Sequence, residues 1–221
     1  MGKGIIRDFE RSSARRDARL PRAAGAPEAE MALFLGRWVK APHRIGALAP
    51  SSRYLARAMA RQIDPRPARV VVELGGGTGS ITRALLETGL APEKLIVVER
   101  DERLHRLLAE RFPQLRVIGG DAAQLAALLR PLGVTGISTI VSGLPLLSMT
   151  KRLRQRIVEQ SFALLGDSGS LVQFTYGLAS PLPASDFALS GRIVARVWRN
   201  FPPACVWRFQ RPAPAAIARV A

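Results

Sequence analysis

Residues 69–82, RVVVELGGGTGSIT, decide the fold, because a short apolar run leads directly into a cluster of glycines. The β-branched residues at 70–72 predict a strand buried on both faces, as in a parallel sheet. The glycines allow a sharp turn and let a ligand approach the backbone closely. Helical spacing follows at 80–90, where Ile81 and Leu85 share one face. The stretch therefore predicts a strand, a ligand-binding turn and a helix.

The same alternation continues as far as residue 176. Further strands are expected at 94–99, 115–119, 136–142 and 169–176, with helices at 101–112, 121–129 and 151–165. Strands that alternate with helices at this pitch predict right-handed crossovers and a doubly wound sheet.

The last two apolar runs, 191–201 and 205–210, have only a short segment containing Pro202 and Pro203 between them. Strands joined this closely must be antiparallel, because a parallel connection needs a long crossover. The expected fold class is therefore α/β, with a seven-stranded, mostly parallel sheet, a C-terminal antiparallel hairpin and an N-terminal helical extension. This architecture resembles that of Rossmann-like class I methyltransferases.

The composition indicates the kind of partner and makes a metal site unexpected. The 221 residues include 33 Lys and Arg against 17 Asp and Glu, which gives a net charge of +16. A chain this basic is attracted to a polyanion, either nucleic acid or an anionic membrane surface. The single cysteine excludes an internal disulfide and a Cys-ligated zinc site, and two histidines are too few for a His-rich one. No metal is expected.

The chain is expected to divide into a basic, amphipathic helical segment at 1–68 and the Rossmann-like domain at 69–221. Arg7 and Arg11 lie one helical turn apart, and Trp38 belongs to the apolar and basic run MALFLGRWVK. Such a composition is typical of a helix lying in a membrane interface. The alternative is a helix that packs on the core with a solvated basic side. Neither a signal peptide nor a spanning helix is expected.

The glycine cluster has the spacing E-x-G-x-G-x-G. It lacks the last glycine of the dinucleotide fingerprint and the Gly-Lys-Ser/Thr of a P-loop. It resembles motif I of class I S-adenosylmethionine-dependent methyltransferases. The residues that this resemblance assigns to the cofactor are Glu73, Gly75, Gly77 and Gly79.

Two acidic residues at the next strand ends extend the same cofactor outline. Glu99 ends the second expected strand, where a carboxylate can accept both ribose hydroxyls. Asp121 follows the third strand, where members of the superfamily bind the adenine amino group. Their neighbours Arg100 and Ala122 are assigned to the same site. The alternatives are a solvated strand end for Glu99 and a helix N-cap for Asp121.

The fourth strand ends in SGLPL at 142–146, beside the point where such sheets bind ligands. The segment resembles the N/D/S-x-P-x motif of amino-methyltransferases, which faces the transferred methyl group. Ser142 is therefore expected to contact the cofactor and to orient a nucleophilic nitrogen. An ordinary strand-to-helix turn is the alternative.

Several segments together resemble the bacterial PmtA-type phospholipid N-methyltransferases. They are the glycine motif, SGLPLLSM, QFTYG, and the run RWVKAPHRIGALAPSSRYLARAM at 37–59. The resemblance implies S-adenosylmethionine as cofactor and methylation of phosphatidylethanolamine and its mono- and dimethyl derivatives toward phosphatidylcholine. It also implies anionic lipids as partners, with no nucleic acid or obligate protein partner, and a cytoplasmic enzyme peripheral on the inner membrane face.

The competing interpretation is an rRNA adenine N6-dimethyltransferase, whose core is related. Such enzymes carry an aromatic after the fourth strand to stack on a flipped adenine, where this chain has Leu146, and Ser142 replaces their Asn. A non-catalytic membrane-binding module would not need the three-part cofactor outline. Small-molecule methyltransferases remain a further class.

A lipid ammonium, with a pKa of roughly 10 like that of lysine, must lose a proton before it can accept a methyl group. Tyr176 ends the fifth strand, and Tyr54 lies on a helix that covers the cofactor in the resembling family. Either is expected to accept a hydrogen bond from the amine or to hold the methylated ammonium by cation–π contact. Arg53 is expected to meet lipid phosphate. The alternatives are packed tyrosines and a solvated basic face.

Overall fold

The computed structural model describes residues 52–65 and 69–212. Arg7, Arg11 and Trp38, with the interfacial helix expected around Trp38, lie outside these ranges, and the expected membrane docking of the N-terminal segment stays a prediction. The division of the chain at residue 68 also stays a prediction.

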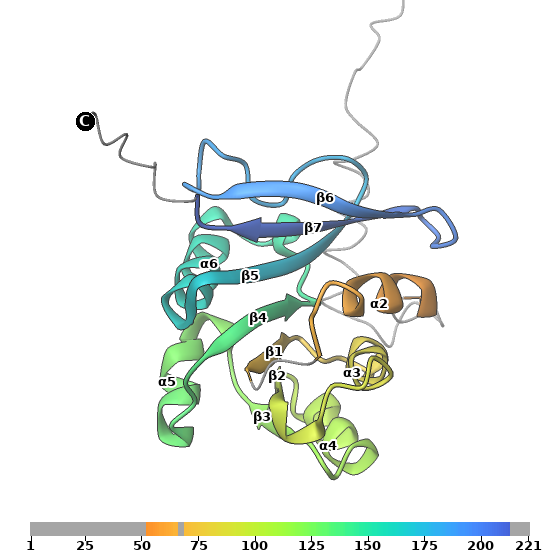
Figure 1. Ribbon diagram of the computed structural model, residues 1–221, viewed down its shortest axis with the longest axis vertical. Coiled ribbons are helices and arrows are strands. Elements are labelled where there is room, and N and C mark those ends of the chain that lie inside the picture. Colours follow the sequence, from red (N-terminus) through yellow and green to blue (C-terminus); the bar gives the residue numbers. More distant parts are fainter. Residues whose placement is uncertain (1–51, 66–68, 213–221) are drawn as a thin grey trace, which may run out of the picture.

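The core is one seven-stranded sheet in the order β3-β2-β1-β4-β5-β7-β6 (Figure 1). Strands β1 to β5 run parallel to one another, which confirms the expected doubly wound arrangement. The strands are β1 Val70–Leu74, β2 Leu95–Glu99, β3 Arg116–Gly119, β4 Ile137–Ser142, β5 Leu165–Tyr176, β6 Ser190–Val197 and β7 Ala204–Gln210.

The C-terminal strands form the expected antiparallel hairpin, and β7 inserts between β5 and β6. Cys205 of β7 lies opposite Thr175 of β5 on one side and Arg196 of β6 on the other, with both pairings antiparallel. Strand β6 therefore runs in the same direction as β5. Its turn into β7, at 198–203, thus lies at the carboxyl edge of the sheet, where the parallel strands end.

Helices cover both faces of the sheet (Figure 1). Apolar residues of α2, α3 and α4 pack in one hydrophobic cluster with one face of the strands, and those of α5 and α6 pack in a second cluster on the other face. The helices are α2 Arg53–Ala60, α3 Ser80–Leu86, α4 Glu102–Arg111, α5 Leu125–Leu129 and α6 Lys151–Leu164, with short 3-10 turns η1 Pro92–Lys94, η2 Ala122–Gln124, η3 Arg130–Leu132 and η4 Leu146–Ser148.

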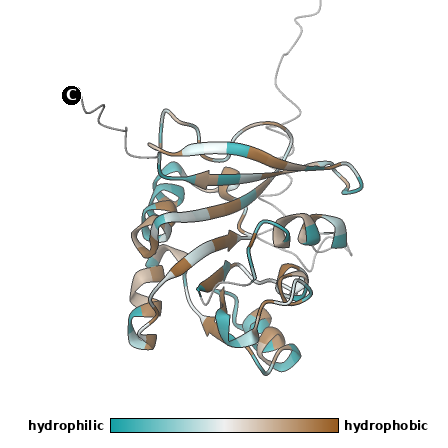
Figure 2. Cartoon of the chain, viewed as in Figure 1, coloured by the Kyte–Doolittle hydropathy of each residue, from teal (hydrophilic) through white to brown (hydrophobic). Residues whose placement is uncertain are grey.

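Alternation along each strand assigns its side chains to the two clusters. Val71 of β1 and Val141 of β4 belong to the α2–α4 cluster, whereas their neighbours Val72 and Ile140 belong to the α5–α6 cluster. Figure 2 shows apolar residues concentrated along the central strands and hydrophilic ones on the helices. Two buried faces explain why the strands read as continuous apolar runs rather than as alternating ones.

Helix α2 is fixed by its N-cap residue, Ser52. The Ser52 hydroxyl accepts a hydrogen bond from the Leu55 amide at 3.3 Å and donates one to Asn200 Oδ1 at 2.5 Å. Leu55 and Met59 are buried in the α2–α4 cluster. The start of α2 is thereby held against the turn between β6 and β7.

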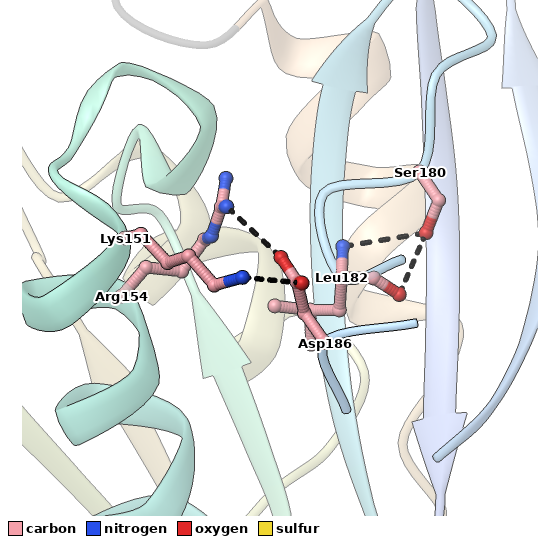
Figure 3. Close-up of polar contacts among 5 residues, drawn as sticks. All are labelled: Lys151, Arg154, Ser180, Leu182 and Asp186. Carbon is pink, nitrogen blue, oxygen red and sulfur yellow. Dashed lines mark hydrogen bonds and ion pairs between the residues drawn. The ribbon is translucent and has the colours of Figure 1, made fainter. Parts of the chain in front are cut away.

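The long connection from β5 to β6 is fastened to the start of α6 (Figure 3). Asp186 accepts from Lys151 Nζ at 2.6 Å and lies 3.8 Å from Arg154 Nη2. In the same connection, Ser180 Oγ accepts from the Leu182 amide and donates to the Leu182 carbonyl oxygen.

Among the described residues, no helix has both the length and the apolar character needed to cross a bilayer.

Candidate functional site

Three loops meet at the carboxyl edge of β1, β2 and β4. The Gly75 amide donates to the Val98 carbonyl oxygen at 2.8 Å, and the Gly143 amide donates to the Leu74 carbonyl oxygen at 2.8 Å. The Gly120 amide donates to the Glu99 carbonyl oxygen at 3.0 Å. These main-chain bonds hold the glycine loop and the loops after β3 and β4 to the ends of β1 and β2, as expected of a ligand site in such a sheet.

The glycine loop needs its glycines. Gly75, Gly77 and Gly79 have φ angles of 73°, 56° and 86°, a left-handed conformation that other residues rarely adopt. A Cβ on Gly76 would lie only 2.5 Å from Val97 Cγ1, so side chains are excluded there too. A Cβ on Gly77 would meet nothing closer than the Gly75 carbonyl oxygen at 4.0 Å. The loop is thus tightly packed at Gly76, against Val97, and open to a ligand at Gly77.

Glu99 holds the glycine loop to the loop after β2. Its Oε2 accepts from the Gly77 amide at 2.9 Å, and its Oε1 accepts from the Asp101 amide at 2.9 Å. Each carboxylate oxygen has two lone pairs, so each can still accept a hydroxyl hydrogen. The carboxylate can therefore brace the loop and bind a ribose diol at the same time.

Glu73 lies beneath the loop rather than on its open side. Its side chain is fully buried, and Oε2 accepts from Thr82 Oγ1 of α3 at 2.7 Å. Oε1 has no hydrogen-bond partner among the described residues. Burial raises the pKa of Glu73 to about 8, because the charged form loses its hydration. Glu73 braces β1 against α3, and its assignment to the cofactor stays a prediction.

Asp121 is the N-cap of η2, and its binding of an adenine amino group stays a prediction. Its Oδ1 accepts from the Ala123 amide at 2.9 Å and caps η2, while its Oδ2 lies 3.9 Å from Arg100 Nη1. The Arg100 side chain is largely exposed and that of Asp121 is partly exposed, so solvent weakens their ion pair. Ala122 is buried beside them. Oδ2 is thus the oxygen left to accept from an adenine amino group.

Ser142 is fully buried at the end of β4, where its Oγ accepts from the Leu144 amide at 3.3 Å. Gln173 of β5 lies opposite Ser142 in the sheet. Its Nε2 donates to the Leu144 and Phe174 carbonyl oxygens, both at 2.9 Å, while its buried Oε1 has no partner among the described residues. Gln173 thus holds the loop after β4. Sequence reasoning did not select it, although a glutamine in an apolar strand was a usable signal.

Tyr176 lies on the α2–α4 side of the sheet, packed edge-on against Phe174 with ring centroids 5.4 Å apart. Burial raises the pKa of its hydroxyl, and a hydrogen bond with Asn200 opposes that shift. The buried Asn200, which also binds Ser52, therefore joins Tyr176, α2 and the β6–β7 turn. No sequence pattern identified Asn200.

Tyr54, at the start of α2, has two guanidinium groups close to its ring. The carbon atoms of the Arg53 and Arg199 guanidinium groups are 5.0 and 5.1 Å from its ring centroid. Arg53 also donates to the Tyr54 hydroxyl at 3.1 Å, and this bond lowers the tyrosine pKa. The ring is thus already engaged in cation–π contacts, and Arg53 is turned toward it.

The groups at this edge suit S-adenosylmethionine. The loop above Gly77 is open, and Glu99 and Asp121 each keep acceptor capacity. Among residues 52–65 and 69–212, no three His, Cys, Asp or Glu side chains gather as a metal site.

Comparisons with known proteins fit this site. No family model matches the chain. The chain is 40% identical over 146 residues to ornithine lipid N-methyltransferase of Singulisphaera acidiphila, which covers 65% of this chain and 76% of that protein. It is 33% identical over 152 residues to ribosomal RNA small subunit methyltransferase A of Phenylobacterium zucineum, covering 60% of this chain but only about half, 52%, of that relative.

Two solved structures share the fold. TrmN from Thermus thermophilus has a TM-score of 0.54 and 20% identity, covering 72% of this chain and 48% of its own. A TehB-like S-adenosylmethionine-dependent methyltransferase from Corynebacterium glutamicum has a TM-score of 0.50 and 18% identity. The match covers 83% of this chain and 99% of that protein.

The sheet order and the site at its carboxyl edge define a class I S-adenosylmethionine-dependent methyltransferase. The chain is thus a methyltransferase, and S-adenosylmethionine is its cofactor. Since it is 40% identical to a relative of which it spans three quarters, it belongs to the same family as that ornithine lipid N-methyltransferase.

Replacing Glu99 tests its double role. Glu99→Ala removes the bond to the Gly77 amide and the expected acceptor of the ribose hydroxyls, so affinity for S-adenosylmethionine should fall about ten- to hundredfold. Isothermal titration calorimetry measures this, with the exposed Glu93→Ala as the matched control. An unchanged dissociation constant would remove Glu99 from the cofactor site.

The buried Glu73 carboxyl makes stability depend on pH. The folded state keeps this proton up to about pH 8, whereas the unfolded chain loses it near 4.5. The folded state binds more protons between these values, so stability falls as pH rises, by at most about 1.4 kcal/mol per pH unit. Glu73→Gln should flatten this dependence in urea unfolding of the ligand-free protein between about pH 5.5 and 7.5. The control Glu93→Gln should keep the wild-type dependence of stability on pH. If Glu73→Gln keeps it too, the Glu73 carboxyl is not its source.

Proposed function

We propose that the enzyme methylates the head-group amine of a membrane lipid, with phosphatidylethanolamine and its mono- and dimethyl derivatives as acceptors. The observation that carries this proposal is the 40% identity to a lipid N-methyltransferase. Ornithine lipid, the substrate in that relative's name, also presents an amine and is the first alternative acceptor. The enzyme would then work as a peripheral protein on the cytoplasmic membrane face.

S-adenosylmethionine supplies an electrophilic methyl group on a sulfonium sulfur. The protein must bring a neutral amine in line with it, because an ammonium has no free electron pair to form the new bond. A tyrosine hydroxyl is protonated at neutral pH, and burial raises the pKa of Tyr176 further from neutrality. Tyr176 can therefore orient the amine by accepting its hydrogen bond but cannot remove its proton. Ser142, held by the Leu144 amide, is the second candidate to orient the nitrogen.

The rRNA alternative is disfavoured by one residue. Leu146 occupies the position at which the resembling RNA enzymes carry a stacking aromatic, and its side chain is buried in the α5–α6 cluster. A buried leucine cannot stack on a flipped base. The RNA relative therefore supports the shared core rather than the shared substrate.

An acceptor panel tests the proposal directly. The purified protein is incubated with radiolabelled S-adenosylmethionine and one acceptor: phosphatidylethanolamine vesicles, ornithine-lipid vesicles, phosphatidylcholine vesicles or small-subunit rRNA. Label should enter phosphatidylethanolamine, while phosphatidylcholine, which has no free amine, stays unlabelled. Label in ornithine lipid alone would transfer the proposal to that head group. Label in rRNA alone would contradict lipid methylation.

Tyr176→Phe tests the orienting hydroxyl. Loss of a hydrogen bond to the reacting amine should lower turnover about ten- to hundredfold and leave S-adenosylmethionine affinity nearly intact. Tyr54→Phe is the matched comparison, since that hydroxyl is bonded to Arg53 and should contribute less. Full turnover in Tyr176→Phe would show that the hydroxyl does not position the amine.

A further inference from the structure

Exposed large apolar side chains gather at one edge of the molecule. Among the described residues, four of the five follow a strand whose carboxyl end lies at the same edge of the sheet as the site, and the fifth, Leu107, lies on α4. The four and their exposed fractions are Leu147 after β4 (38%), Leu178 after β5 (63%), and Trp198 and Phe201 after β6 (74% and 91%). Apolar groups exposed together at one place mark an interaction surface.

The two aromatics are held rigidly on the turn between β6 and β7. Asn200, which lies between them in the sequence, is buried and donates to the Pro202 carbonyl oxygen at 2.6 Å. Asn200 also accepts from Ser52, which ties the turn to α2. Figure 1 shows this turn projecting beyond the body of the sheet. The turn thus presents Trp198 and Phe201 outward from a fixed base.

The hairpin that carries this turn is strongly basic. Residues 190–210 contain four arginines and no acidic residue. Arg192, Arg196 and Arg199 are exposed, and Arg199 comes directly after Trp198. Tryptophan favours the headgroup level of a bilayer, and arginine is attracted to anionic lipids at the same level. This combination matches an anionic lipid surface in both charge and polarity.

We propose that the β6–β7 turn docks the enzyme on an anionic bilayer by inserting Trp198 and Phe201 among the lipid headgroups. Because β6 runs parallel to β5, the turn lies at the same edge as the glycine loop and Tyr176. Docking through the turn therefore directs the methyl-transfer site toward the membrane. The inference rests on the proposed function in one respect, that the acceptor amine is presented at a lipid surface.

The test uses the full-length chain with Trp198→Ala and Phe201→Ala combined. Binding is measured by co-sedimentation with vesicles of phosphatidylglycerol and phosphatidylcholine, which contain no acceptor amine. The partition coefficient should fall about tenfold or more, because two apolar side chains no longer leave water. The control is Leu107→Ala, which removes an exposed apolar side chain from α4 and should bind as wild type does. Calorimetry with S-adenosylmethionine confirms that both variants are folded.

Two further measurements locate the contact. Arg192→Gln combined with Arg196→Gln should weaken binding and reduce its salt dependence, because fewer charges meet the anionic surface. Brominated lipids should quench the tryptophan fluorescence of the wild type, and Trp198→Phe should lose a large part of that quenching. Quenching that is the same in Trp198→Phe and wild type would overturn insertion of this turn.

Other outcomes are equally decisive. Unchanged sedimentation of the double variant would place docking elsewhere, and loss of rRNA binding with vesicle binding intact would assign the turn to RNA. If the wild type is a dimer and the double variant is a monomer that still binds vesicles, the turn contacts a second copy of the chain.

A short-chain, water-soluble phosphatidylethanolamine separates this inference from the proposed function. The wild type and the double variant should methylate this soluble lipid equally. If neither methylates it, the proposed substrate is refuted, while the vesicle-binding result still stands.

Discussion

The Glu99 carboxylate is the contact on which the site depends, because it holds two loops with one charged group. It accepts main-chain hydrogen bonds from Gly77 and Asp101, and bonds to an ionised acceptor are stronger than neutral ones. Three left-handed glycines would otherwise leave the loop with many conformations to lose on ligand binding. The cradle is therefore preorganised, and binding energy is not spent on ordering it.

The direction of the strands explains why so many separate features meet at one edge. Parallel strands deliver their following loops to the same end of the sheet, and the placement of β7 between β5 and β6 adds the last turn to that end. Asn200 then connects this turn to both α2 and Tyr176. A displacement of the turn would therefore shift Tyr176, which is expected to orient the acceptor.

Local patterns were sufficient to predict the order of strands and helices from residue 69 onward, because buried β-branched runs, glycines and helical spacing each act over a few residues. They did not give every boundary, since β5 begins at Leu165 rather than at 169 and β6 ends at Val197 rather than at 201. The glycine loop could be predicted for the same reason, as its motif is continuous. The insertion of β7 could not, since a hairpin pairs equally well whichever of its strands faces β5. Asn200 and Gln173 act through partners far along the chain, Ser52 and Leu144, so local sequence could at most mark Gln173 as a polar residue in an apolar strand and could not show which residues it binds. The positions of Glu99 and Asp121 at the ends of β2 and β3 were foreseeable, whereas the burial of Glu73 under α3 depends on packing.

The insertion of β7 also has a consequence for biosynthesis. Strand β6 is hydrogen-bonded to β7 alone among the described strands, so it has no place in the sheet until β7 has left the ribosome. The Trp198–Phe201 turn is shaped only when that pairing forms. Translation itself would thus delay any use of the turn until the catalytic sheet is whole.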